Sequence, residues 1–310
     1  MATSAAAAAG GSSVAVDEVA VEVHRKDYRP VPYAAAVVDL LFQLHEEATS
    51  VVSTIKFAAN PAAGGSKAGG PLELNGAPEV ELVSLSLDGV AVPASGYERT
   101  PKGGLLLKAV PGGEGFTLRV ETRIKPQENT SLEGLYKSSG NFSTQCEAEG
   151  FRRITFFQDR PDVMAVYTVR LEADKAAYPV LLSNGNLVDS GDVAGQQGRH
   201  FAVWHDPFVK PCYLFALVAG NLACTEDVFV TKSGRSVALR IWTQHHNASK
   251  TAHAMVSLKK SMAWDEQRFG LEYDLDLFNI VAVDDFNMGA MEVSCFVVDG
   301  GSAHPRADVQ

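Results

Sequence analysis

The sequence predicts a mainly β protein, with an N-terminal antiparallel β-sandwich or saddle-shaped domain followed by the start of an α/β lobe. Between about residues 28 and 222, short alternating or β-branched runs are separated by glycine, proline and polar turns. One long amphipathic helix pattern and one strongly apolar run come after this region. The 310 residues suffice for about two domains of roughly 150 residues each.

The strands of the first region follow from alternation along the chain. Val37–Phe42, Val80–Leu85 and Thr117–Val120 are short apolar or alternating runs, and Val163–Leu171 alternates before it ends at charged residues. Successive side chains of a strand point to opposite faces of a sheet. Each run therefore predicts a strand with one buried face.

The pattern changes after Leu222, where we place a domain boundary. Asp227–Thr231 and Val237–Trp242 predict two strands joined by a turn at Ser233-Gly234. Leu277–Val283 predicts a further, strongly apolar strand. We expect this strand to present a poorly protected edge, and limited proteolysis to leave a resistant core that ends near residue 222.

A helix is predicted between these strands, over residues 247–269. Its apolar residues recur at three- and four-residue spacings along one face. Asn247 fits the position of an N-cap, and Gly270 fits the position of a helix stop.

Composition excludes several classes of partner. The net charge of -10 argues against nucleic acid and anionic membranes, because both bind basic patches. The sequence has no run of eighteen apolar residues that would predict a membrane span, and the first 13 residues lack the basic and apolar regions of a signal peptide.

Four widely spaced cysteines predict buried thiols in a reducing compartment: Cys146, Cys212, Cys224 and Cys295. We expect a cytoplasmic location, with an organelle reached through a weak N-terminal transit segment as the alternative.

Several segments carry a resemblance to a known family. In chain order they are Arg25-Lys26-Asp27-Tyr28 with Pro32-Tyr33, Leu132–Tyr136, Thr144–Arg152, Asp159–Asp162, Lys210–Phe215, Trp264–Glu266, Asp274–Asp276 and Asn287–Glu292. They resemble the N-terminal part of the aminopeptidase N (alanyl aminopeptidase) family of zinc metallopeptidases. A lone GAME tetrapeptide is weak evidence, but here it follows QCEAEGFR by about 140 residues, with DRPDV between them.

The resemblance divides the chain into four parts. It implies a flexible tail (residues 1–22), an N-terminal β domain (23–222), the truncated start of a thermolysin-like α/β catalytic domain (223–292), and an unrelated tail (293–310).

The resemblance also implies a substrate-binding site and assigns no catalytic or metal-binding residue within this chain. The site residues are Gln145, Glu147, Met288, Gly289, Ala290, Met291 and Glu292. An aminopeptidase must bind the free N-terminal ammonium of a peptide, and carboxylates suit this task because they are ionised at neutral pH. By resemblance, Glu147 and Glu292 bind the ammonium, and Gln145 and Met288 shape the first side-chain pocket. Gly289 and Ala290 leave the backbone open for the peptide to pair along a strand edge.

Zinc is the cofactor of the full-length family, and we expect none in this chain. The family holds zinc through an HExxH motif and a further glutamate, and no HExxH occurs here. The nearest match, His45-Glu46-Glu47-Ala48-Thr49, lacks the second histidine and lies in a segment expected to be strand-like. His245 and His246 are adjacent rather than four residues apart, and we expect them in a turn.

The resemblance stops at Val293, where the family has asparagine. Val293-Ser294 can be encoded by GTG followed by AGC or AGT, which resembles the start of an intron. We therefore expect the spliced messenger RNA to continue from Glu292 into the family's asparagine and, further on, HExxH, with a real truncated paralogue as the alternative.

These observations lead to two hypotheses about function. In the first, the chain is the N-terminal portion of a zinc aminopeptidase that removes N-terminal residues from peptides. We expect the chain to be inactive by itself, because the zinc ligands and the general base are absent. Its partners are peptide N-termini, with no nucleic acid and no membrane. The alternative is a non-catalytic peptide- or protein-binding β domain derived from the family.

Overall fold

The computed structural model describes residues 22, 24–64, 69–284, 286, 290–293 and 296–300, and it describes side chains as far as Met291. Several predictions fall outside these residues: nearly all of the tail at 1–22, the site residues Met288 and Gly289, Cys295, and residues 301–310 of the second tail. The described residues form four sheets and one long helix. The mainly β prediction is confirmed.

The largest sheet, called here the large sheet, has eight strands among the described residues. In spatial order they are β13 (Asn186–Asp192), β14 (Arg199–Pro211), β11 (Met164–Asp174), β1 (Tyr33–Gln43), β2 (Thr49–Ala59), β8 (Gly115–Ile124), β4 (Glu81–Leu87) and β5 (Val90–Ala91). Neighbouring strands are antiparallel except β1 and β11, which are parallel. The four runs of alternating residues lie in β1, β4, β8 and β11, as predicted.

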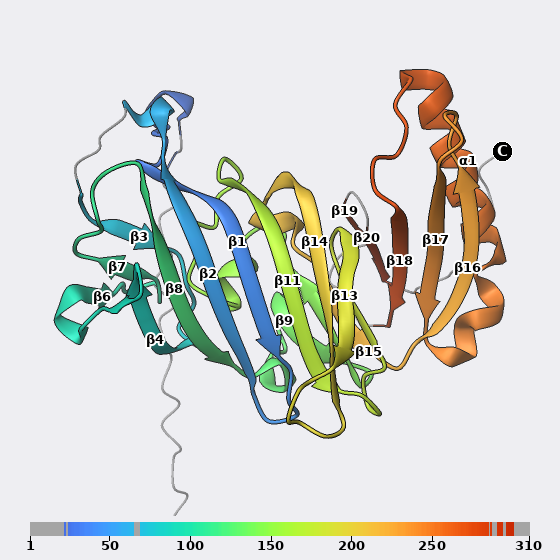
Figure 1. Ribbon diagram of the computed structural model, residues 1–310, viewed down its shortest axis with the longest axis horizontal. Helices are drawn as coiled ribbons and strands as arrows, with labels where there is room; N and C mark the ends of the chain where they lie inside the picture. The colour runs from blue at the N-terminus through green and yellow to red at the C-terminus, as the bar shows by residue number, and fades with distance from the viewer. Residues whose placement is uncertain are drawn as a thin grey trace, which may run out of the picture.

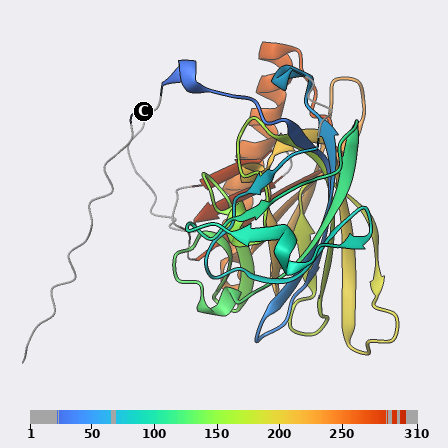
Figure 2. The ribbon, with the colours of Figure 1, turned by 90° about the vertical axis from the view of Figure 1, so that its left-hand side faces the viewer.

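Two smaller sheets pack with the large one. The small sheet has the order β12 (Val180–Ser183), β15 (Leu217–Gly220), β10 (Asn141–Gln145) and β9 (Gly134–Ser138). The three-stranded sheet has the order β3 (Leu72–Leu74), β7 (Leu105–Leu107) and β6 (Tyr97–Arg99). Figure 1 shows the small sheet behind the large one, and in Figure 2 the three-stranded sheet faces the viewer. Alternate side chains of β1 and β2 are fully buried between the layers, among them Val38, Phe42, Val51 and Ile55.

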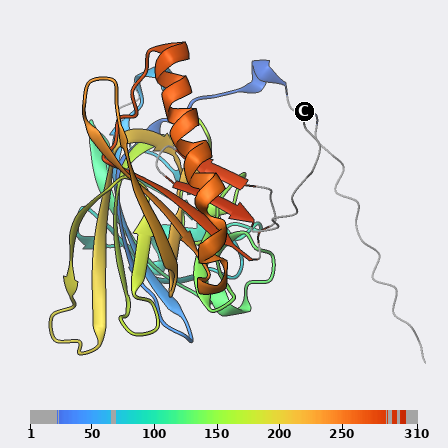
Figure 3. The ribbon, with the colours of Figure 1, turned by 90° about the vertical axis from the view of Figure 1, so that its right-hand side faces the viewer.

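The C-terminal sheet begins at Ala223. Its order is β16 (Ala223–Val230), β17 (Ser236–Thr243), β18 (Leu277–Val283), β20 (Phe296–Gly300) and β19 (Ala290–Val293). The helix α1 (Ala252–Phe269) lies along one face of this sheet (Figure 3). Val237, Leu239 and Ile241 on that face form a core with Met255 and Met262 of α1.

The opposite face of the C-terminal sheet joins the core of the sandwich. Leu277, Val281 and Val283 of β18 belong to the same buried cluster as the side chains of the large and small sheets. Strand alternation explains this division, because odd-numbered residues of β18 point to one face and even-numbered residues to the other. The C-terminal sheet is therefore packed on both faces.

Three predictions about local structure are wrong. The strand β18 is not an edge, because β20 pairs with it in parallel on the side away from β17. His45 and its neighbours lie in the connection between β1 and β2 rather than in a strand. The helix begins at Ala252 instead of residue 247, after a short 3-10 helix, η7 (His245–Lys250).

The late helix start has a structural cause. The Thr251 hydroxyl bonds the carbonyl of Ala248 at 3.0 Å and the hydroxyl of Thr225 in β16 at 2.7 Å. These contacts hold the chain against the sheet before the helix begins. The predicted stop at Gly270 is confirmed, because this residue has a left-handed backbone (φ 70°) and its N–H donates to the carbonyl of Glu266.

The cysteine prediction holds for two of the three described residues. Cys146 and Cys212 are buried free thiols, whereas Cys224 is exposed on β16. None of the described helices is both long and apolar enough to cross a membrane.

Candidate functional site

Two predicted site residues lie at the end of the small sheet, where β10 leads into a tight turn. Gln145 is the last residue of β10 and is fully buried. Neither its amide nitrogen nor its amide oxygen has a hydrogen-bond partner among the described residues. Glu147, two residues later, is exposed. A buried amide without a partner is unusual, because buried polar groups are nearly always paired.

Residues 146–150 form this turn, called here the Glu147 turn. The N–H of Gly150 donates to the carbonyl of Cys146 at 2.8 Å and closes the turn. A side chain at Gly150 would meet the carbonyl oxygen of Gln145 at 2.3 Å, so the turn requires glycine there. The peptide bond between Glu147 and Ala148 is cis.

The buried carboxylate of Asp159 lies outside the Glu147 turn and holds the C-terminal end of the turn through Arg152. Arg152 lies in the short 3-10 helix η5 (Phe151–Arg153) directly after the turn. Its backbone N–H and its Nε donate to Asp159 Oδ2 at 3.1 Å and 2.9 Å. Its Nη1 pairs with Glu149 of the turn at 2.9 Å. The side chain of Asp159 is only 1% exposed, so these charge-assisted bonds are shielded from water.

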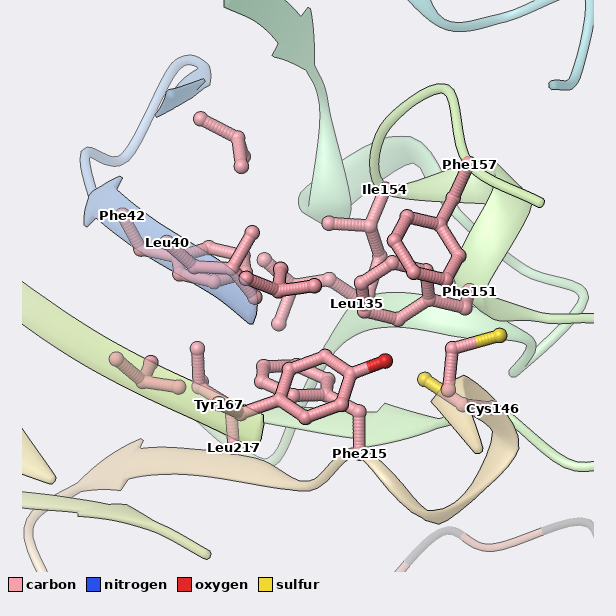
Figure 4. Packing of buried hydrophobic residues seen from close by; sticks show 14 of the residues in the cluster. Leu40, Phe42, Leu135, Cys146, Phe151, Ile154, Phe157, Tyr167, Phe215 and Leu217 are labelled. Atoms are coloured by element: carbon pink, nitrogen blue, oxygen red, sulfur yellow. The ribbon is translucent and has the colours of Figure 1, made fainter. Parts of the chain in front are cut away.

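Cys212, the first residue of the 3-10 helix η6 (Cys212–Leu214) after β14, contacts the same carboxylate. Its Sγ–H donates to Asp159 Oδ1 at 3.0 Å. Burial, and then the charge of Asp159, raise the pKa of the Cys212 thiol well above its ordinary value, so the thiol keeps the proton that it donates. Figure 4 shows the neighbouring core, in which Cys146, Tyr167 and Phe215 belong to one buried cluster.

Two segments that carry the family resemblance, Arg25–Tyr28 and Asp159–Asp162, meet close to this network. The Arg160 guanidinium makes two bonds with Asp162, at 2.8 Å and 2.7 Å, and a third with the carbonyl of Arg29 at 3.0 Å. The Tyr28 hydroxyl donates to Asp162 at 2.9 Å. The Arg160 bond, followed by the Tyr28 bond, holds the pKa of Asp162 below its ordinary value. Long-range polar contacts therefore join the segments that the sequence motifs mark.

The remaining site residues that the structure describes lie on β19. This strand is at the edge of the C-terminal sheet in the described part of the chain, and β20 pairs with it on its inner side. Ala290 is half-buried, and Met291 is buried in the same cluster as Cys146. The backbone of Glu292 pairs with Val297. The structure therefore places Ala290, Met291 and Glu292 on one edge strand.

No group of three or more histidine, cysteine, aspartate and glutamate side chains among the described residues could hold a metal ion. The Nδ1 of His45 lies 3.2 Å from an Arg199 nitrogen, and burial followed by the Arg199 charge lowers the pKa of His45. His245 lies in η7 and contacts Asn221 at 3.0 Å. The described side chains do not fit a zinc site.

The hollow beside the Glu147 turn is distinct from the predicted site. It has a volume of about 850 Å³ and is lined in part by Ala148, Glu149 and Arg153. Four of its six charged lining side chains pair with one another, Arg153 with Glu133 at 3.2 Å and Arg152 with Glu149 at 2.9 Å. Gln145 and Glu147 do not line it.

Comparison with known proteins agrees with this geometry. Residues 107–214 match the model of the Peptidase M1 N-terminal domain. The chain is 51% identical to aminopeptidase N of Caulobacter vibrioides over 270 residues, which cover 87% of this chain and 30% of that protein. It is 49% identical to aminopeptidase N of Escherichia coli over 269 residues, which cover 87% of this chain and 29% of that protein. The chain matches the N-terminal part of the aminopeptidase N family.

Comparison with solved structures also matches this chain to part of an aminopeptidase. The crystal structure of Legionella pneumophila aminopeptidase A in complex with aspartic acid superposes with a TM-score of 0.83 at 34% identity, over 89% of this chain and 31% of that one. The chain thus spans about three-tenths of the length of the curated relatives it matches.

Sequence reasoning quoted Arg152, Asp159 and Cys212 within the family motifs but gave them no role. Their shared position in motifs of the aminopeptidase N family was the available signal. Their contact could not be read from spacing, because Cys212 is 53 residues from Asp159 in the chain.

Proposed function

We propose that this chain supplies the part of an aminopeptidase that binds the N-terminal amine of a peptide. In this proposal Glu147 binds the ammonium, and Gln145 shapes the pocket for the first side chain. The observation that carries it is the exposed side chain of Glu147 two positions after the buried, unpartnered amide of Gln145. The Glu147 carboxylate is available to accept a charge-assisted hydrogen bond. The Gln145 amide has donors and an acceptor that bind no other described residue.

The strand β19 supplies the second half of the proposed site. Glu292 provides a second carboxylate for the ammonium, and Met288 completes the side-chain pocket. Gly289, Ala290 and Met291 present backbone along which a peptide adds as a further strand. The position of β19 at the edge of the C-terminal sheet supports this part of the proposal.

The domain division belongs to the same proposal. We infer an N-terminal β domain at residues 23–222 and the start of a catalytic domain at residues 223–292. The sheet that begins at Ala223 supports this boundary. The two free buried thiols support a cytoplasmic location.

Peptide cleavage itself requires groups that this sequence does not contain. Zinc is the proposed cofactor of the whole enzyme, and this chain has no HExxH motif. We therefore expect the dialysed chain to hold no stoichiometric zinc and to cleave no aminoacyl reporter substrate. Metal analysis beside an activity assay checks this. One tightly held equivalent of zinc with metal-dependent turnover would contradict it.

Binding of short peptides to this chain tests the amine site. A peptide with a free N-terminus should shift the NMR signals of the Glu147 turn, and the same peptide with an acetylated N-terminus should not. Glu147→Gln keeps the shape but removes the charge, so affinity should fall by about 1.5–3 kcal/mol. Glu128→Gln, an exposed position elsewhere on the domain, is the matched control. Equal binding of free and acetylated peptides would rule out the proposal.

A hybrid that joins residues 1–292 to the remaining length of a relative tests both carboxylates. Glu147→Gln and Glu292→Gln should each lower kcat/KM by an amount equivalent to about 1.5–3 kcal/mol on unblocked substrates, because each removes a charged hydrogen bond. Zinc content should not change. Unchanged kcat/KM in both variants would show that the assignment does not carry over.

A further inference from the structure

Three residues of the Glu147 turn, Glu147, Ala148 and Glu149, are exposed. Gly150 closes the turn with one backbone bond to Cys146. An exposed turn of this kind samples many conformations unless other groups hold it. A carboxylate that must meet an ammonium at hydrogen-bond distance needs a fixed position.

Asp159 is positioned to hold the Glu147 turn in place. One of its carboxylate oxygens accepts two bonds from Arg152, whose guanidinium also reaches Glu149 inside the turn. The other oxygen accepts the Sγ–H of Cys212. The backbone N–H of Asp159 donates to Asn75 at 3.1 Å, which orients the residue from a third direction. Asp159 thus joins the turn to the start of the 3-10 helix η6 (Cys212–Leu214) through its carboxylate, and to the segment that follows β3 through its backbone N–H.

We propose that Asp159 and Cys212 are positioning residues for Glu147. This inference rests on the proposed function, in which Glu147 binds the substrate amine. The buried carboxylate keeps Arg152 and the end of the turn in place, and the thiol holds the carboxylate in the orientation that Arg152 needs. Removal of the thiol leaves one oxygen of a buried carboxylate without its sulfur donor, which favours other orientations of Asp159.

The test uses Cys212, because loss of the buried charge at Asp159 risks unfolding the domain. Cys212→Ala removes the donor, whereas Cys212→Ser keeps an O–H donor in the same place. Cys224→Ala, at the exposed thiol of β16, is the control. Hydrogen exchange of the Gly150 amide reports on the turn, and affinity for an unblocked peptide reports on Glu147.

We expect exchange of the Gly150 amide to be about five- to tenfold faster in Cys212→Ala, with a similar loss of peptide affinity, and both to return toward the wild-type values in Cys212→Ser. A role in core packing alone would lower the Tm of both variants without this rescue. Wild-type exchange rates in Cys212→Ala would overturn the inference. Faster exchange in a protein whose wild-type form binds no unblocked peptide would instead refute the proposed amine site and leave the support of the turn standing.

Discussion

The turn that carries Glu147 and the strand that carries Glu292 are held by different forces. Buried side chains, above all Asp159, fix the turn. Backbone pairing with β20 fixes the strand β19 on one side, and its other side is an edge in the described part of the chain. Side-chain networks depend on the identity of particular residues, whereas backbone pairing is compatible with most side chains. Single substitutions should therefore disturb the first half of the proposed site far more than the second.

The core beneath the Glu147 turn also differs from the core under α1. Phe151, directly after the Glu147 turn, is fully buried and packs edge-on against Phe157, Tyr167 and Phe215. The core under α1 is smaller, and Met262 within it is 8% exposed. A larger and more enclosed core loses more when one side chain is shortened.

The largest expected effect comes from shortening one side chain in each core. Phe151→Ala should lower the free energy of unfolding by about 3–5 kcal/mol, and Met262→Ala by about 2 kcal/mol, because the second site can relax toward solvent. Urea unfolding followed by circular dichroism measures both. A loss for Met262→Ala equal to that for Phe151→Ala would show that the C-terminal sheet is packed as tightly as the sandwich.

A smaller effect is expected where the two regions meet. Asn186 of β13 donates to the Asp276 carboxylate at 3.1 Å and accepts from the Asp276 backbone N–H at 3.1 Å. Asn186→Asp places a second carboxylate there, and the repulsion should speed hydrogen exchange in β18. Because Asp276 is 73% exposed, the cost should be about 1 kcal/mol or less. Adding Asp276→Asn should restore slow exchange, and failure of this rescue would show that the contact does not join the regions.

The smallest effect concerns pH and the far end of the sandwich. Glu46, between β1 and β2, accepts hydrogen bonds from Lys137 and Tyr178. The Lys137 bond, and then the Tyr178 bond, lower the pKa of Glu46 from its ordinary value near 4.5. A lowered folded-state pKa adds stability above the unfolded pKa, and that stability is lost as pH falls through the folded value.

Glu46→Gln should therefore reduce stability slightly at pH 7 and make the urea midpoint fall less between pH 5 and pH 3. The side chain is 62% exposed, so the difference should stay below about 1 kcal/mol. The neighbouring exposed Glu47→Gln is the control. Identical pH profiles for Glu46→Gln and the wild-type chain would show that solvent screens the pair completely.

The sequence by itself determined the local elements of this protein. Alternation predicted β1, β4, β8 and β11, and the left-handed preference of glycine predicted the end of α1 at Gly270. The quoted motifs predicted the family and so the candidate residues Gln145 and Glu147. These signals are local, because strand period, helix caps and short motifs each depend on a few neighbouring residues.

Only the tertiary structure decided what holds those elements in place. The β18 strand reads as an edge in the sequence, yet β20 pairs with it. The helix begins at Ala252 because Thr251 contacts Thr225 in another strand. Asp159 supports the Glu147 turn through Arg152, and its other carboxylate oxygen is bound by Cys212, 53 residues away in the chain. Each of these outcomes depends on which distant residues the packed sheets bring within hydrogen-bond distance. Spacing along the chain does not predict these contacts.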